Sequence, residues 1–153
     1  MAEAAAAGHA PAVVLDTNVV LDWLVFADPV SAPLAQALEA RALRLVSNAE
    51  CLAELERVLA YPVLALDAAR QAAALVRYRE RAVLMNEVLR APPGLPRCSD
   101  VDDQKFLELA WHAHAHWLVT KDNALLTLAA RVARLGRFAI VSPAGLSAAL
   151  TPP

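Results

Sequence analysis

The most informative stretch of the chain is Val13-Val14-Leu15-Asp16-Thr17-Asn18, where an apolar run ends abruptly in polar residues. An apolar run this short is typical of a strand that is buried on both faces of a sheet. Asn18 is a residue type that often caps helices, so we predict that it begins a helix extending to about Phe26. The stretch therefore predicts a buried strand with the carboxylate of Asp16 at its end.

Strands and helices alternate along the rest of the chain. Further strands are predicted at residues 43–47, 117–120 and 138–141, with a very short one at 97–98. Helices are predicted at residues 33–41, 48–60, 66–90, 100–114, 123–133 and 143–150. This alternation is typical of an α/β protein whose parallel sheet is covered by helices on both faces. Such sheets bind ligands outside the carboxyl ends of their strands.

Length and composition limit what the protein can be. With 153 residues the chain is long enough for one domain, which we expect at residues 13–150 behind a flexible leader at 1–12. Hydrophobic residues make up 58 %, yet no apolar run approaches the roughly 18 residues of a membrane helix. We expect no membrane contact, and the apolar excess favours a homo-oligomer.

Charge and cysteine content exclude further classes. A net charge of −2 excludes a strongly basic protein that coats nucleic acid, but not an enzyme that acts on nucleic acid through metal ions. The two cysteines, Cys51 and Cys98, are far apart in sequence and form no metal-type pair. This usage indicates a reducing, cytoplasmic location.

Carboxylates gather near the predicted strand ends. Asp16 ends the first strand and Asp122 follows the strand at 117–120, while Glu54 lies within a helix. Asp100, Asp102 and Asp103 begin the helix that leads into the strand at 117–120. If the two strands are neighbours, these acids converge and need cations between them, for which Mg²⁺ or Mn²⁺ suits oxygen ligands. Each acid alone could equally be a helix cap, a turn residue or part of a solvated face. Helical positions do not choose between Asp102 and Asp103.

Four motifs, in order, resemble the PIN domain family, and most closely the bacterial toxin components of toxin–antitoxin systems related to the VapC toxins. They are the run ending Asp16-Thr17-Asn18, the helix segment 49–59 with Tyr61-Pro62, the segment 99–107, and Leu118-Val119-Thr120-Lys121-Asp122. The resemblance covers about residues 13–149. It implies a three-layer α/β/α fold with a five-stranded parallel sheet in the order 3-2-1-4-5.

The resemblance also implies a metal-dependent ribonuclease that leaves a 5′-phosphate and a 3′-hydroxyl. Its catalytic and metal-binding acids fall on Asp16, Glu54, Asp103 and Asp122, with Asp100 as an additional acid. Polar residues lining the site fall on Thr17, Asn18 and Thr120. The candidates for phosphate contacts are Lys105, Lys121, Arg131 and Arg134, which could equally lie on solvated helix faces. The expected cofactor is Mg²⁺ or Mn²⁺, and the expected partners are single-stranded or loop RNA and an antitoxin protein.

Other interpretations remain open at this point. His112, His114 and His116 could bind a transition metal or donate a proton, although a helix end that favours histidine is the simpler explanation. An aspartate-based phosphatase would need a second aspartate where Asn18 stands. A receiver domain would need paired acids after the first strand and a lysine after the last. Two alternatives are compatible with all four motifs: a PIN-fold binding scaffold, and an RNA-processing nuclease without an antitoxin.

Overall fold

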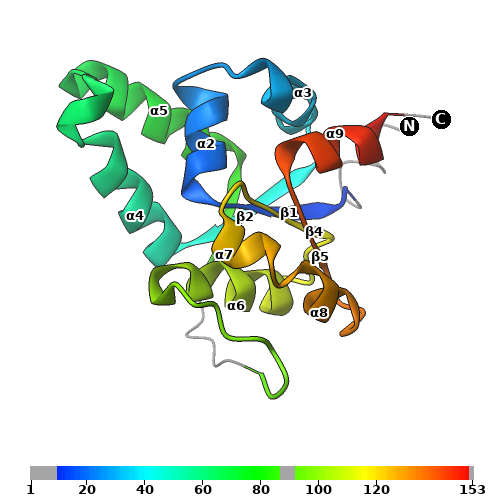
Figure 1. Cartoon of the computed structure of the whole chain (residues 1–153). Coiled ribbons are helices and arrows are strands. Elements are labelled where there is room, and N and C mark those ends of the chain that lie inside the picture. The colour runs from blue at the N-terminus through cyan, green and yellow to red at the C-terminus, as the bar shows by residue number, and fades with distance from the viewer. Residues whose placement is uncertain (1–9, 87–91, 152–153) are drawn as a thin grey trace.

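The computed structural model describes residues 10–86 and 92–151. Its five-stranded, all-parallel sheet has the order β3-β2-β1-β4-β5, which confirms the predicted fold class and strand order. The strands are β1 (Ala12–Leu15), β2 (Arg44–Asn48), β3 (Ala82–Met85), β4 (Trp117–Val119) and β5 (Ala139–Val141). Helices cover both faces of the sheet (Figure 1).

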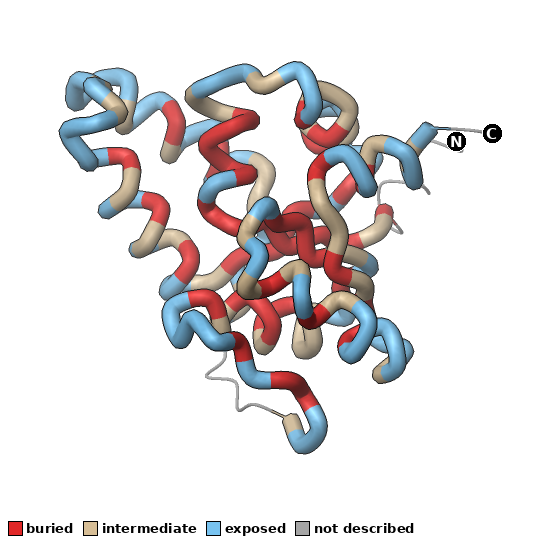
Figure 2. Tube along the Cα trace, viewed as in Figure 1, coloured by how far each residue is buried: buried red, intermediate tan, exposed pale blue. Residues whose placement is uncertain are grey.

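β1 is the central strand and its side chains alternate between two hydrophobic cores. Val13 and Leu15 pack into the core formed with α2 (Thr17–Leu24), α3 (Ala32–Glu39), α5 (Ala68–Arg81) and α9 (Pro143–Leu150). Ala12 and Val14 pack into the opposite core, against α6 (Gln104–His112), α7 (Asn123–Leu126) and α8 (Ala129–Ala133). Figure 2 shows the buried residues concentrated along the central strands and the helix faces toward them.

Helix α4 (Ala49–Leu59) contributes to both cores, with Cys51 in one and Leu55 and Leu59 in the other. It begins as predicted at Asn48, whose side chain accepts a hydrogen bond of 2.9 Å from the backbone N–H of Cys51. The remaining elements are three short 3₁₀ helices: η1 (Pro29–Ser31), η2 (Pro62–Leu64) and η3 (Val101–Asp103). None of the described helices is long and apolar enough to cross a membrane.

Two strand and helix predictions are wrong. The helix predicted at 66–90 ends at Arg81, and Ala82–Met85 form the edge strand β3; positions 87–90 lie outside the described residues. The apolar run of β3 is too short for its period to distinguish strand from helix, and pairing with β2 makes it a strand. The strand predicted at 97–98 is absent, because β3 takes that place in the sheet.

Helix starts and ends also differ from the prediction, and the helix predicted at 100–114 consists of η3 followed by α6. α2 begins at Thr17 with Asp16 in the N-cap position, so Asn18 is an exposed residue of the first turn and not the cap. The helix predicted at 123–133 is divided into α7 and α8. Most of the leader expected at 1–12 lies outside the described residues, and β1 already begins at Ala12.

Candidate metal centre

The carboxyl ends of β1 and β4 bring distant acids to one edge of the sheet. β1 and β4 are hydrogen-bonded neighbours, and the backbone N–H of Asp16 donates to the Val119 carbonyl over 2.9 Å. Asp16 therefore leaves β1 beside the point where Thr120, Lys121 and Asp122 leave β4. This is the side of a parallel sheet on which ligands bind.

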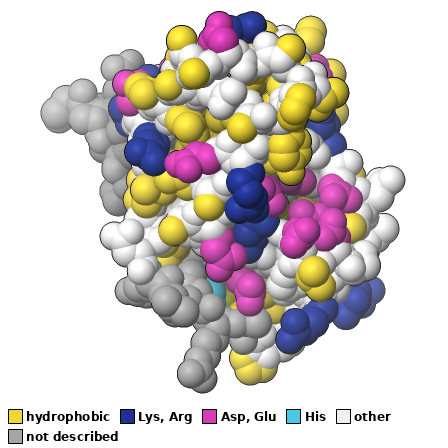
Figure 3. All heavy atoms as spheres, turned by 90° about the vertical axis from the view of Figure 1, so that its left-hand side faces the viewer, with side chains coloured by type: hydrophobic (Ala, Val, Ile, Leu, Met, Phe, Trp, Pro, Cys, Tyr) yellow, Lys and Arg dark blue, Asp and Glu magenta, His cyan; other side chains and the backbone are white. Residues whose placement is uncertain are grey.

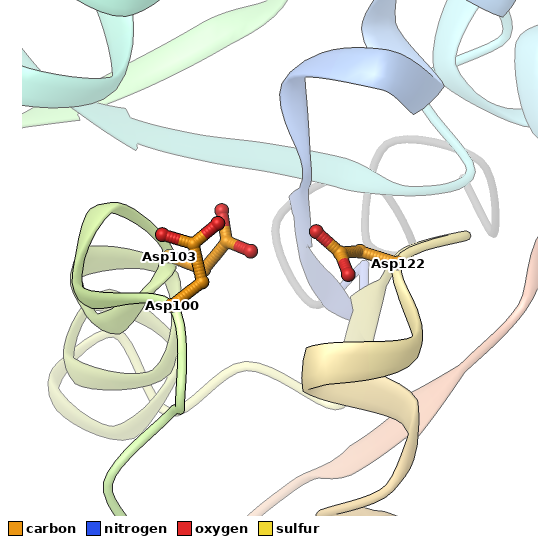
Figure 4. Close-up of side chains that lie close together, drawn as sticks. All are labelled: Asp100, Asp103 and Asp122. Atoms are coloured by element: carbon orange, nitrogen blue, oxygen red, sulfur yellow. The ribbon is translucent and has the colours of Figure 1, made fainter.

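Three aspartates form a compact group at this edge. Asp100, Asp103 and Asp122 each offer a carboxylate oxygen, and these oxygens all lie within 4.8 Å of one another. In Figure 4, Asp100 and Asp103 project from the segment of η3 that leads into α6, and Asp122 points toward them from the start of α7. Helix starts stabilise negative charge, which helps to explain how three carboxylates share so small a space.

Local capping bonds fix two members of this group. Asp100 Oδ1 accepts a hydrogen bond from the Asp102 N–H over 3.0 Å and so begins η3. Asp122 Oδ1 accepts from the Ala124 N–H over 2.9 Å and so begins α7. Asp100 and Asp122 thus both cap helices, which was the alternative interpretation from the sequence, and the capping bonds orient their carboxylates.

Asp103 is the buried member of the group. Its side chain is 8 % exposed, and its Oδ2 atom has no hydrogen-bond partner in the described part of the chain. Burial, followed by the neighbouring carboxylates of Asp122, Asp16 and Asp100, raises the pKa of Asp103 to about 7. Asp102, the alternative from sequence, is exposed and is not a member of the group.

Asp16 lies next to the group without belonging to it. It is 4 % exposed, and its Oδ2 accepts a hydrogen bond of 2.7 Å from the hydroxyl of buried Thr120. Burial raises the pKa of Asp16, the Thr120 bond opposes that rise, and the charges of Glu54 and Asp122 add to it. Asp16 makes no side-chain capping bond to α2, so capping does not explain a buried carboxylate at this position.

Glu54 is held by two other residues. Its Oε1 accepts from the Lys105 ammonium over 2.8 Å, and its Oε2 accepts from the Thr17 hydroxyl. The side chains of Lys105 and Glu54 are only 13 % and 17 % exposed. The structure therefore brings Glu54 to the same edge as Asp16, but already paired with a cation.

The other predicted cations have different surroundings. Lys121 forms an ion pair of 2.7 Å with Asp22, a buried acid on α2. Arg131 and Arg134 are exposed on and just after α8. Asp22 was not predicted as a site residue, although its carboxylate lies amid the apolar Val19, Val20, Leu21 and Trp23 in the sequence, which is a signal that could have indicated it.

The histidines lie at the opposite end of β4. His114 and His116 precede the strand, whereas Thr120 and Asp122 follow it. The Nδ1 atom of His114 is 3.1 Å from the Arg137 guanidinium, and the backbone N–H of His116 donates to the Ala12 carbonyl. His112 ends α6. The three histidines are not members of the acidic group.

The donor set fits a hard divalent cation. All three members of the group offer carboxylate oxygen, the ligand type that Mg²⁺ and Mn²⁺ prefer. A buried carboxylate oxygen without a partner is costly, and a cation bound among Asp100, Asp103 and Asp122 would satisfy it.

The raised pKa of Asp103 predicts how stability changes with pH in the absence of divalent cations. A pKa of about 7 in the folded protein against 3.8 ordinarily means that the folded state binds the proton more tightly. The stabilisation by that proton is complete below about pH 4 and is lost as the pH rises through 7. Relative to Asp103→Asn, the wild type should lose on the order of 2 kcal/mol of unfolding free energy over this range, since solvent screens part of the effect.

Urea unfolding in EDTA from pH 4 to 8 measures this difference. Asp102→Asn is the matched control and should follow the wild-type profile, because Asp102 is exposed. Parallel profiles for the wild type and Asp103→Asn would contradict the assignment of a perturbed carboxyl at position 103.

Comparison with known proteins agrees with this geometry. The PIN domain family matches residues 12–124, which include β1, α4, the start of α6 and the Thr120-Lys121-Asp122 turn. A search of curated proteins finds no match. PIN domains are typically nucleases that use divalent metal ions. Fold, strand order and family match agree, and the chain belongs to the PIN domain family.

Proposed function

We propose that this PIN domain is a Mg²⁺- or Mn²⁺-dependent endoribonuclease that hydrolyses phosphodiester bonds of single-stranded or loop RNA. The observation that carries the proposal is the buried Oδ2 of Asp103, which lies beside Asp100 and Asp122 and has no hydrogen-bond partner among residues 10–86 and 92–151. A purely structural acid in this position would be expected to have a hydrogen-bond donor. Single-stranded RNA is favoured because its backbone can enter a narrow acidic site.

The residues at the site divide into two sets in this proposal. Asp16, Asp103 and Asp122, with Asp100 beside them, would hold one cation, and Asp16 and Glu54 would share a second when the substrate is present. Bound ions would supply Lewis acidity, which would lower the pKa of the attacking water and neutralise charge on the phosphate. Thr120 orients Asp16 through its hydroxyl, and Thr17 does the same for Glu54. No histidine base is needed in this scheme.

Cations near the rim would meet the RNA backbone. Lys121 directly precedes Asp122 and is 46 % exposed at its side chain, and its ammonium would exchange its partner Asp22 for a phosphate of the RNA. Asn18 is exposed two residues after Asp16 and can donate its amide to a phosphate or sugar oxygen. These contacts would position the RNA without reading its sequence.

The biological role we propose is that of the toxin in a type II toxin–antitoxin pair in the cytoplasm. The motif resemblance supports the toxin role, and two buried, unpaired cysteines support a reducing compartment. An RNA-processing nuclease with no antitoxin uses the same chemistry. A PIN-fold binding scaffold is the alternative of a different class, and it predicts no specific Mn²⁺ binding.

Cleavage of single-stranded RNA should require a divalent cation and the buried aspartate. EDTA should abolish cleavage, and Asp103→Asn should lower kcat/KM at least about 100-fold because a metal ligand is lost. Asp102→Asn is the matched control and should stay within about two-fold of the wild type. A gel assay on a labelled RNA measures all three, and undiminished cleavage in EDTA would refute the metal mechanism.

Asp16→Asn should separate stability from activity. The asparagine oxygen can still accept the Thr120 hydrogen bond while one of several repelling charges is removed. The metal-free variant should therefore be as stable as the wild type or more stable by about 1 kcal/mol, with its activity lost. Added Mn²⁺ should raise the melting temperature of the wild type far more than that of the variant.

Thermal unfolding of both proteins with and without Mn²⁺ checks this. A destabilised variant that gains as much from Mn²⁺ as the wild type does would remove Asp16 from the metal site.

The protein should also form a homodimer or larger oligomer. Several large apolar side chains are exposed. Tyr61 lies just before η2, Val63 in η2, Val76 in α5, and Val83 and Leu84 in the edge strand β3. Pairing between copies would cover such surface. Light scattering at micromolar concentration measures the mass, and a monomer would refute the expectation.

A further inference from the structure

Lys105 is an unusually placed lysine. Its side chain is only 13 % exposed, whereas lysine side chains are mostly exposed in folded proteins. Its ammonium group donates to Glu54 Oε1 over 2.8 Å and also to the backbone carbonyl of Asp102. Lys105 thereby joins α4 to the segment that carries Asp100 and Asp103.

This contact determines what Glu54 is able to do. Both of its carboxylate oxygens are occupied, Oε1 by Lys105 and Oε2 by the Thr17 hydroxyl. Glu54 is not a member of the group formed by Asp100, Asp103 and Asp122. A carboxylate that is already paired with an ammonium attracts a divalent cation less strongly than an unpaired one.

We propose that the ammonium of Lys105 takes the place of a second cation at Glu54 in the substrate-free protein. The free protein then binds one divalent ion at the aspartate group, and Glu54 becomes available only when Lys105 moves away. Lys105 is a positioning residue in this scheme, because it acts through Glu54. The inference rests on the proposed metal-dependent function and deepens it.

The surface beside Lys105 offers its ammonium another position. Lys105 lines a hollow of about 360 Å³ together with Glu50, Arg57, Asp102 and Glu108. Three of these neighbours are acids that can accept the ammonium once Glu54 is drawn to a cation. Figure 3 shows acidic and basic side chains gathered closely on the side of the molecule that carries α4 and α5.

Titration calorimetry with Mn²⁺ alone tests the proposal on the full chain. The wild type should bind one ion. Lys105→Met keeps the length and apolar stem of the side chain but removes the charge, and it should bind a second ion with a Kd at least about ten-fold below the Mn²⁺ concentration at which the wild type still shows no second ion. Lys105→Arg keeps the charge and should behave like the wild type. The double variant Lys105→Met/Glu54→Gln should return to one ion, since the new site needs Glu54.

Glu54→Gln tests the proposal without changing Lys105. Glu54 does not hold the first ion in this scheme, so the variant should bind one Mn²⁺ with a Kd within about two-fold of the wild type. A ten-fold loss would overturn the proposal, as would two ions in the wild type or an unchanged titration of Lys105→Met. Failure of the proposed function would give a different result, because the wild type would then bind no Mn²⁺ and cleave no RNA. That result would overturn both the proposed function and the inference about Lys105.

Discussion

Parallel pairing of β1 with β4 is the constraint on which the site depends. It places Asp16 beside the turn that carries Thr120 and Asp122, although more than 100 positions separate Asp16 from that turn along the chain. Bringing buried carboxylates this close costs electrostatic free energy. The fold offsets that cost locally, through the Thr120 hydroxyl on Asp16 and the Lys105 ammonium on Glu54, and what remains raises the pKa of Asp103. Hydrophobic packing on both faces of β1 holds the acids in place despite their repulsion.

Much of the fold could be predicted from the sequence because four of the five strands are short apolar runs with polar ends. The failure at Ala82–Met85 has a physical cause. This edge strand follows the arginine-rich end of α5, and two of its side chains are exposed, so it lacks the burial that marks the other strands. Its identity depends on pairing with β2, which is a long-range contact that local pattern does not encode. The capping prediction for Asn18 failed because Asp16 ends the strand and begins the helix at once.

The candidate site was predicted less completely than the fold. Spacing alone could place acids at strand and helix ends, but could not choose between Asp102 and Asp103, which differ in burial because η3 turns one outward and the other inward. The pairing of Glu54 with Lys105 could not be predicted either, because the two residues lie on helices 51 positions apart in sequence. The same applies to Lys121 and Asp22. Ion pairs between elements depend on how the helices pack, which the sequence pattern does not specify.

The alternation of side chains along β1 has a mechanical consequence for the site. Asp16 directly precedes α2, whose buried side chains fill one core, whereas Asp103 and Asp122 directly precede α6 and α7, which pack in the other. The acids thus stand on two layers that pack on opposite faces of the sheet and are joined beside the site by the Lys105–Glu54 ion pair. An ion bound by acids of both layers would cross-link the two layers and resist any sliding of one past the other. Metal binding would then both complete the site and make the whole domain more rigid, and loss of the metal would reverse both effects.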